Sequence, residues 1–220
     1  MKNRAYGQYC GFARALEVVG ERWALLIVRD LLLGPQRFTD LQNGLPGIPS
    51  NILTSRLKEL EEAGLVRRRV AARPARGVVY ELTEYGAELQ DVVDRLGRWG
   101  AKSLGDPRPE EAVTARSLMT AMRSTFQPDA ARGVTVSYEL RFGEIALGVR
   151  VDDGTLHVTP GPLPGADLVI EATPAIRALM AGELSPADAL ASGALTVTGD
   201  PRLLTRFASL FRIAVLPAAR

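Results

Sequence analysis

The segment from Pro49 to Val70, PSNILTSRLKELEEAGLVRRRV, limits the possible folds more than any other part of the chain. Leu53, Leu57 and Leu60 recur at intervals of four and three, which predicts a helix with one stripe against a core. An arginine-rich, strand-prone run follows the helix directly, from Leu65. A polar helix followed by a basic strand is typical of a winged helix-turn-helix, so we expect DNA binding.

The remaining faces of this helix carry polar side chains that suit DNA better than a core. The helix is expected to run from Ser50, as its N-cap, to Ala63, because Gly64 is a good stop signal. The predicted DNA contacts on it are Ser50, Asn51, Thr54, Ser55, Arg56 and Lys58. Asn51, Thr54 and Ser55 are assigned to base edges. Arg56 and Lys58 are assigned to phosphates.

An alternative remains open for the two cations of the helix. Arg56 lies three residues before Glu59 and could pair with it. Lys58 could pair in the same way with Glu61 or Glu62. Such surface pairs contribute only a few tenths of a kcal/mol to helix stability. Phosphate contacts and ion pairs within the helix are therefore both compatible with the sequence.

The elements around this helix complete the frame of a winged helix-turn-helix. Helices are predicted at 12–19, 23–33 and 37–41, with a turn at 44–49. Two strands, 65–70 and 78–82, are predicted to form a hairpin, or wing. Arg37 in the third helix and Arg73 and Arg76 in the wing are further predicted DNA contacts.

A last helix of this half, from Thr83 to Gly100, carries a narrow apolar seam. Its apolar residues are spaced four, three, four and three, and they are Tyr85, Leu89, Val92, Leu96 and Trp99. Such a seam usually meets another helix. We expect the same helix of a second subunit there, because a two-fold protein matches a two-fold operator. The alternative is packing against the first helix of the same chain.

Motifs from residue 9 to about residue 100 resemble the HxlR family of bacterial winged-helix regulators. They are a cysteine before helix one, G-x-x-W, RF-x-x-L, LT-x-RL-x-x-L-x-x-x-GL and Y-x-LT-x-x-G, in that order. The resemblance implies a homodimer, formed through the 83–100 helix and the N-terminal helix, that binds double-stranded DNA through the 50–63 helix. The wing departs from the family pattern, because VAARPARGVV stands where a double proline and valine-glutamate are expected.

Cys10 is the single cysteine of the chain. Some members of the resembled family use a cysteine at this position as a thiol sensor, which implies a redox-sensing regulator as one alternative function. A buried structural thiol is the other interpretation. Because there is one cysteine and one histidine, His157, we expect no internal disulfide, no metal site and no cofactor.

Length and charge indicate two domains. The 220 residues, 46% hydrophobic, suffice for two modest cores. Residues 1–105 carry 16 Lys and Arg against 12 Asp and Glu, whereas residues 106–220 carry 11 against 13. We predict a DNA-binding and dimerisation domain at 1–105, a ligand-binding domain at 106–220 and a linker near 104–110. Without a secretory signal or membrane span, a cytoplasmic protein is expected.

The second half has a different pattern. After a predicted helix at 110–126, apolar and polar residues alternate from Val134 to Phe142, which predicts a strand. Runs at 145–151 and 156–158 continue an antiparallel sheet. Three helices are predicted to begin at Thr173-Pro174, Ser185-Pro186 and Asp200-Pro201 and to cover the sheet. The fold class is therefore α+β: a winged helix-turn-helix followed by an antiparallel sheet covered by helices. His157 is expected to face solvent.

Residues 133–212 resemble the sterol carrier protein type 2 fold through D-x-x-I, a helix, G-x-L, GALTVTGD and a final helix. The resemblance implies a lipid-binding domain with an apolar cavity between sheet and helices. The predicted pocket residues are Phe126, Tyr138, Leu140, Met180, Leu195, Phe207 and Phe211. A packed core is the alternative for the same residues.

The sequence favours a regulator over an enzyme. It has no phosphate-binding loop, no nucleophile elbow and no Cys–His pair that marks a catalytic site. The expected function is a homodimeric transcription regulator modulated by an apolar ligand. The alternative is a lipid-binding protein whose N-terminal half serves only dimerisation, and it predicts no sequence preference on DNA.

Overall fold

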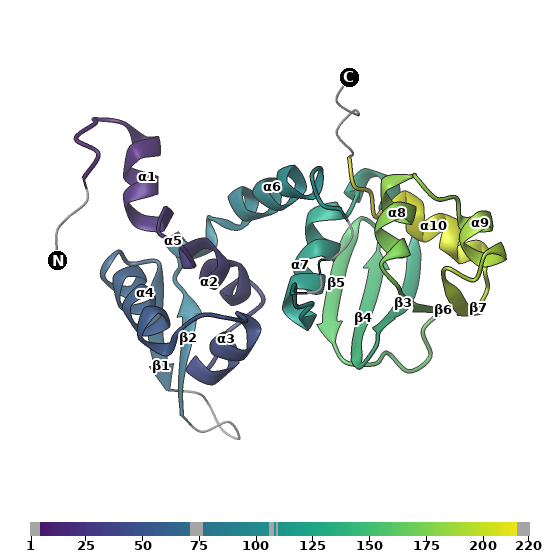
Figure 1. Ribbon diagram of the computed structural model, residues 1–220, viewed down its shortest axis with the longest axis horizontal. Coiled ribbons are helices and arrows are strands. Elements are labelled where there is room, and N and C mark those ends of the chain that lie inside the picture. Colours follow the sequence, from purple (N-terminus) through teal and green to yellow (C-terminus); the bar gives the residue numbers. More distant parts are fainter. Residues whose placement is uncertain (1–4, 71–76, 106–107, 109, 215–220) are drawn as a thin grey trace. The chain divides into compact units, whose positions relative to one another are not determined.

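The computed structural model describes residues 5–70, 77–105, 108 and 110–214 (Figure 1). The chain divides into two compact units, Met1–Val93 and Asp94–Arg220, and each is described by itself. The domain boundary predicted at 105/106 and the linker near 104–110 stay predictions.

The first unit is a helical domain with a two-stranded hairpin. Its helices are α1 (Gly11–Val19), α2 (Ala24–Leu31), α3 (Phe38–Gly44), α4 (Ser50–Glu62) and α5 (Glu84–Ala87). Its strands are β1 (Val66–Val70) and β2 (Val78–Leu82), and α6 (Gln90–Ala101) begins in this unit. The order of elements is that of the predicted winged helix-turn-helix, with α3 and α4 as its helix pair (Figure 1).

The core of this unit forms around the leucine stripe of α4. Leu53, Leu57 and Leu60 are at most 2% exposed. They belong to a buried cluster with Ile27, Val28, Leu31, Leu41, Leu45, Ile48, Leu65, Val66 and Val93. The predicted four-and-three stripe therefore faces the core, and burial of its apolar surface fixes which side of α4 meets solvent.

The hairpin is attached to the start of α3. Strands β1 and β2 pair antiparallel, with Val66 opposite Leu82 and Val70 opposite Val78. Gln36 extends this sheet, because its N–H donates to the Tyr80 carbonyl at 2.9 Å and its carbonyl accepts from the Tyr80 N–H at 2.7 Å. The predicted wing is confirmed for its two strands, and backbone hydrogen bonds join β2 to Gln36, two residues before α3.

The helix predicted from Thr83 to Gly100 is two helices, α5 and α6, so this prediction is wrong at residues 88–89. The Thr83 hydroxyl caps α5 by accepting from the Gly86 N–H at 3.1 Å, and it donates to the Gly64 carbonyl at 2.7 Å. The Leu89 N–H then bonds to the Gly86 carbonyl, three residues back, and the first helix ends. Packing of α5 against the start of β1 directs this break.

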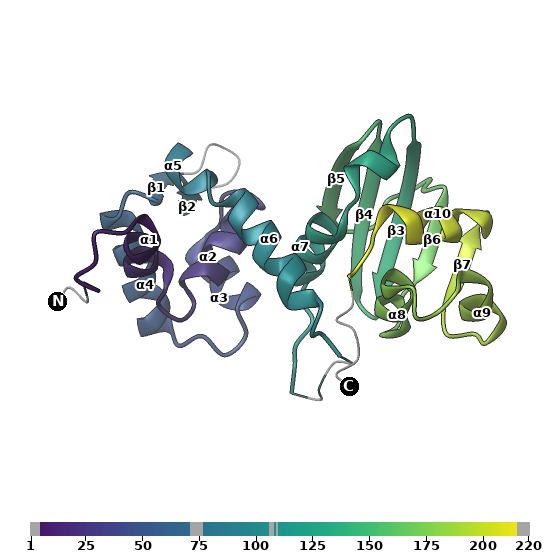
Figure 2. The same cartoon turned by 90° about the horizontal axis from the view of Figure 1, so that it is seen from above.

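The second unit is a five-stranded sheet covered by helices. Its helices are α7 (Ala115–Thr125), η1 (Pro128–Ala131), α8 (Ala175–Ala181), α9 (Pro186–Ala191) and α10 (Arg202–Leu210). Its strands are β3 (Thr135–Phe142), β4 (Ile145–Asp152), β5 (Thr155–Pro160), β6 (Leu168–Glu171) and β7 (Thr196–Gly199), in the order β5-β4-β3-β6-β7 (Figure 2). The α+β fold class is confirmed.

One strand pair departs from the predicted antiparallel sheet. Three of the four pairs are antiparallel, but β6 runs parallel to β3, with Tyr138 opposite Leu168. The reason is the connection at 161–167, which crosses one face of the sheet from β5 to the far side of β3. Leu163 on this connection donates its N–H to the buried Glu139 carboxylate at 2.7 Å. A Cβ at Gly148 would lie 3.1 Å from the Leu163 Cβ, so glycine there permits the crossing.

The helix predicted at 110–126 starts later, at Ala115, because Thr114 caps it. The Thr114 hydroxyl accepts from the Ser117 N–H at 3.1 Å, and the Ser117 hydroxyl accepts from the Thr114 N–H at 3.0 Å.

The three later helix starts are confirmed. Thr173, Ser185 and Asp200 each accept a backbone N–H at the beginning of α8, α9 and α10. His157 is exposed on β5, as predicted.

Among the described residues, no helix combines the length and the hydropathy needed to span a bilayer. In the same ranges, no three His, Cys, Asp or Glu side chains are grouped in a way that could hold a metal ion.

The approach of α5 to β1 gives a stability prediction. A Cβ at Gly86 would lie 2.1 Å from the Leu65 carbonyl oxygen, which is backbone and cannot rotate away. We expect Gly86→Ala to lower the free energy of unfolding by about 1 to 3 kcal/mol, measured by urea unfolding. Gly11→Ala is the control, because a Cβ there meets nothing within 4 Å and alanine favours the helix. Equal stability of the two variants would contradict the packing.

Candidate nucleic-acid interface

The solvent side of α4 begins with the residues assigned to base edges. Asn51 and Thr54 are exposed, and Ser55 is half-buried. Two hydroxyls bond within the helix: Thr54 Oγ1 donates to the Ser50 carbonyl at 2.8 Å, and Ser55 Oγ donates to Glu59 at 3.0 Å. Among the three, Asn51 alone makes no side-chain hydrogen bond to a described residue, and its amide carries both a donor and an acceptor.

Ser50 is not the N-cap of α4. Pro49 holds that position with an extended backbone, and Ser50 is the first helical residue, exposed to solvent. The C-terminal boundary of α4 agrees with the prediction, because Ala63 is the C-cap and Gly64 follows with φ +74°. Ser50 therefore lies in the first turn, where backbone N–H groups are free to meet an anion.

Arg56 makes the ion pair that was the alternative to a phosphate contact. Its guanidinium bonds to Glu59 on α4 and lies 3.0 Å from Glu21 Oε2, which is 35 residues away in the sequence. Its side chain is 17% exposed. Lys58 pairs at 3.6 Å with Glu62, and both side chains are well exposed. Lys58 is therefore much the more accessible of the two cations.

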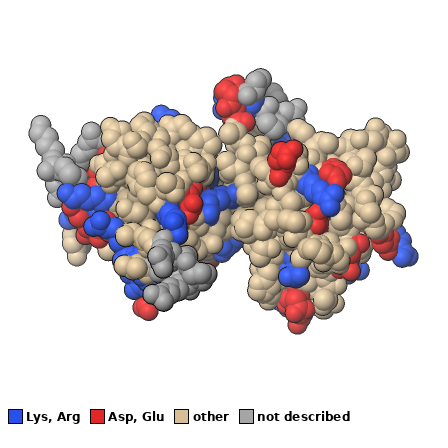
Figure 3. Space-filling model, turned by 90° about the horizontal axis from the view of Figure 1, so that it is seen from below, with Lys and Arg blue, Asp and Glu red and all other residues tan. Residues whose placement is uncertain are grey.

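The arginines of β1 also have carboxylate partners. Arg67 Nε and Arg69 Nε lie 2.8 and 2.9 Å from the two oxygens of Glu81 on β2. Arg68, on the other face of the strand, lies 2.8 Å from Glu61 on α4. Acidic and basic side chains are accordingly interspersed on the first unit (left half of Figure 3).

Glu81 shows the electrostatic effect of this arrangement. The hydrogen bond from Arg69, and then that from Arg67, holds the pKa of the Glu81 carboxyl below its usual 4.5. The Glu81 carboxyl is ionised at pH values above its lowered pKa. Its ion pairs with Arg67 and Arg69 are lost as the pH falls through that lowered pKa. Glu81 is not among the residues predicted from the sequence, although its position opposite Arg67 in the hairpin register indicates the pairing.

Arg37 lies beside the wing rather than on α4. Its side chain is exposed at the start of α3, and a Cβ added at Gly77, just before β2, would lie 3.8 Å from its Nη1. The predicted contacts Arg73 and Arg76 lie outside the described residues.

Large apolar side chains are exposed near α1 and along α5 and α6. On α5 and α6, Tyr85, Val92, Leu96 and Trp99 are 60%, 51%, 46% and 70% exposed. Tyr6, Tyr9 and Phe12, at and before α1, are exposed as well. Cys10, at the N-cap position of α1, is also exposed, which argues against its interpretation as a buried structural thiol.

The seven residues assigned to a ligand pocket are all buried in the second unit. Four of them contact one another in a row: the ring centroids of Phe126 and Phe211 are 5.7 Å apart, those of Phe211 and Phe207 4.8 Å, and those of Phe207 and Tyr138 5.3 Å. This row of rings is a packed part of the core between the sheet and α10. A ligand role for Phe126, Tyr138, Leu140, Met180, Leu195, Phe207 and Phe211 stays a prediction.

Comparison with known families confirms both resemblances. The HxlR-like helix-turn-helix family matches residues 18–107, and the SCP-2 sterol transfer family matches residues 128–212. The uncharacterized HTH-type transcriptional regulator YvaP from Bacillus subtilis is 35% identical over 91 residues, which cover 41% of this chain and 84% of YvaP.

A second relative aligns over a longer stretch. The uncharacterized HTH-type transcriptional regulator Rv3095 from Mycobacterium tuberculosis is 43% identical over 110 residues, covering 50% of this chain and 66% of Rv3095. Among solved structures, quinone-bound YodB from B. subtilis has 36% sequence identity and a TM-score of 0.36, over 40% of this chain and 93% of that one.

The pairing of Glu81 gives a titration prediction. Replacing Arg67 and Arg69 by Gln is expected to raise the pKa of the Glu81 carboxyl toward 4.5, because both hydrogen bonds that favour its charged form are removed. An NMR titration of the side-chain carboxyl carbon measures this. Arg68→Gln is the control, because Arg68 pairs with Glu61 and should leave Glu81 unchanged. An unshifted Glu81 in the double variant would refute the assignment.

Proposed function

The chain belongs to the HxlR-like helix-turn-helix family, and we propose that it is a transcriptional regulator that binds double-stranded DNA as a homodimer. The observation that carries the proposal is the orientation of α4. Its leucine stripe is buried and its first two turns present Ser50, Asn51 and Thr54 to solvent. In a helix-turn-helix, this end of the second helix meets the base edges in the major groove.

We divide the contacts by chemistry. Asn51 reads a base, since an amide can bond adenine through two hydrogen bonds. Thr54 and Ser55 reach base edges after rotation of hydroxyls that now bond within α4. Lys58 and Arg37 contact phosphates, because both side chains are exposed and cationic. Arg73 and Arg76 are proposed phosphate or minor-groove contacts on the wing.

We propose that Arg56 contacts a phosphate only after its guanidinium releases Glu21 or Glu59. Its guanidinium is held by Glu21 and Glu59 in the free protein. A phosphate must replace at least one carboxylate, so the net gain from this arginine is smaller than that from Lys58.

We propose that the subunits meet through the apolar seam of α6 and the N-terminal helix. Val92, Leu96 and Trp99 are spaced four and three along α6, so they share one face. Their exposure in the single chain supports a partner surface, because contiguous exposed apolar side chains commonly mark interaction sites. A two-fold dimer would place two copies of α4 about one DNA turn apart, roughly 34 Å.

We also propose that an apolar ligand in the second unit changes the affinity for DNA. The match to a sterol transfer family supports this part of the proposal. The packed row of aromatic rings requires that such a ligand displace or enter between core side chains. It can shift the equilibrium only if it binds the two DNA-affinity states differently.

The division of contacts predicts two different binding defects. Asn51→Ala is expected to weaken binding to a duplex from the protein's own upstream region by about 5- to 150-fold per half-site, equivalent to 1–3 kcal/mol for each subunit, while binding to a random duplex changes little. Lys58→Gln is expected to weaken both duplexes equally and to reduce the slope of log affinity against log salt by about 0.9 per subunit, or about 1.8 for the dimer. Fluorescence anisotropy at several salt concentrations measures both effects.

Equal affinity of the wild-type protein for the two duplexes would refute sequence-specific regulation. In that case the protein would be the lipid-binding alternative, with dimerisation as the role of its first unit.

The proposed dimer has its own test. Leu96→Lys is expected to convert the dimer into a monomer, because it places a charge in the centre of an apolar seam. Asp91→Lys, an exposed position one turn earlier and outside the seam, should leave the dimer intact. Analytical ultracentrifugation of both variants distinguishes these outcomes. A monomeric wild-type protein, or a dimeric Leu96→Lys protein, would exclude this interface.

A further inference from the structure

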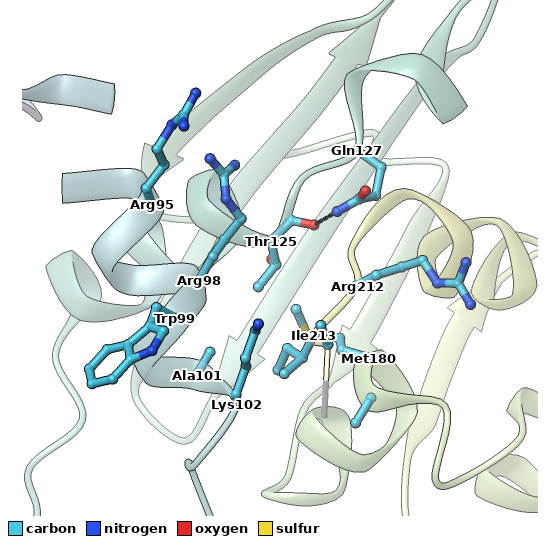
Figure 4. A pocket seen from close by; sticks show the side chains of 12 residues that line it. Arg95, Arg98, Trp99, Ala101, Lys102, Thr125, Gln127, Met180, Arg212 and Ile213 are labelled. Atoms are coloured by element: carbon cyan, nitrogen blue, oxygen red, sulfur yellow. Dashed lines mark hydrogen bonds between the residues drawn. The ribbon is translucent and has the colours of Figure 1, made fainter. Parts of the chain in front are cut away.

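A pocket of about 680 Å³ lies within the second unit, apart from the row of aromatic rings. One wall is the end of α6, and the others are the ends of α7 and α8 and the segment after α10 (Figure 4). Its volume lies in the range of small-molecule sites, about 300 to 1,000 Å³. Its lining shares no residue with the proposed DNA-binding surface. It shares Met180 with the predicted apolar pocket and Trp99 with the proposed dimer seam.

The charges that line this pocket have one sign. Arg95, Arg98 and Lys102 come from the second half of α6, and Arg212 lines the pocket from the C-terminal segment, with its side chain directed away from α6 (Figure 4). The lining residues include no aspartate or glutamate. Within the described part of the chain, none of these four cations has an ion pair with a carboxylate. Lining charges of one sign, without carboxylates among them, favour an anion over a cation as the occupant.

The lower part of the pocket is apolar. Met180, which is 5% exposed, and the half-buried Ile213 lie between the α6 cations and Arg212 (Figure 4). Ala101 and Ala181 add small apolar side chains. A ligand that matches both parts has a charged group at the cations and an apolar body against Met180 and Ile213.

Backbone hydrogen bonds hold the walls in place. The Arg212 N–H donates to the Thr125 carbonyl and the Ile213 N–H to the Met180 carbonyl, each at 2.9 Å. The Gln127 side chain donates to the same Thr125 carbonyl at 2.9 Å. On the opposite wall, Gly97 lets α6 approach α7, because a Cβ there would lie 3.3 Å from the Ser124 Cβ. The cations therefore project from fixed backbone.

We propose that this pocket binds a small organic anion, a carboxylate or a phosphate carried on an apolar body. Arg98 and Arg212 provide the planar, bidentate donors that suit either head group. Met180 and Ile213 provide the contact surface for the body. This site differs from the apolar ligand site of the proposed function, because its ligand must be charged.

The test uses calorimetry on the full-length protein to compare three probes that share a naphthalene ring and differ in their head group. They are 1-naphthyl phosphate, 1-naphthoate and the neutral 1-naphthalenemethanol. At least one anion is expected to bind about tenfold or more tightly than the alcohol, since a charge-assisted hydrogen bond contributes that much. The difference between the two anions identifies the preferred head group. The affinity of the preferred anion should fall with added salt, whereas the affinity of the alcohol should not change.

Two variants locate the effect. The double variant Arg98→Gln/Arg212→Gln is expected to lose the preference for the anion. Arg150→Gln is the matched control, because Arg150 is an exposed arginine on β4 that does not line the pocket. Circular dichroism of each variant verifies folding, and both substituted arginines of the pocket are exposed. Equal binding of anions and alcohol by the wild type, or an anion preference that survives the double substitution, would overturn the proposal.

Discussion

Burial of the α4 leucine stripe is the constraint on which the first unit depends. Leu53, Leu57 and Leu60 each lose almost all exposure, and together they contribute several kcal/mol of apolar burial, at about 1.5 to 3 kcal/mol per side chain. The stripe fixes the rotation of α4 about its own axis. The same three contacts therefore decide that Asn51 and Lys58 face solvent, so the stability of the fold and the orientation of its reading surface have one cause.

Features that depend on local sequence could be predicted, and those that depend on distant residues could not. The spacing of the leucines, the stop at Gly64 and the hairpin strands follow from neighbours along the chain. The division of the last helix depends on the contact of Gly86 with Leu65, 21 residues earlier. The ion pair of Arg56 with Glu21 is likewise non-local, so sequence alone could not choose between a phosphate contact and a structural pair.

In the second unit, too, local pattern predicts individual strands of the sheet but not a contact between distant segments. Strict alternation predicts β3 and β4, because each side chain follows from the pleat of its own strand. The parallel pair of β3 and β6 depends on a connection that crosses the sheet at Gly148 and bonds to Glu139. Local pattern contains no signal for that crossing. Local pattern does not predict the proposed anion pocket for a similar reason. Its three cations on α6 lie 110 or more residues before Arg212 in the sequence.

The carboxylates beside the arginines of β1 and α4 have a consequence for how the protein searches a genome. Glu81, Glu61 and Glu59 already neutralise much of the positive charge that arbitrary DNA would attract. Under the proposed function, Arg56 must release a carboxylate before it gains a phosphate, which lowers the free energy that it gains on any DNA. Such a surface would favour release from unrelated sequence and retention where α4 meets its matching bases.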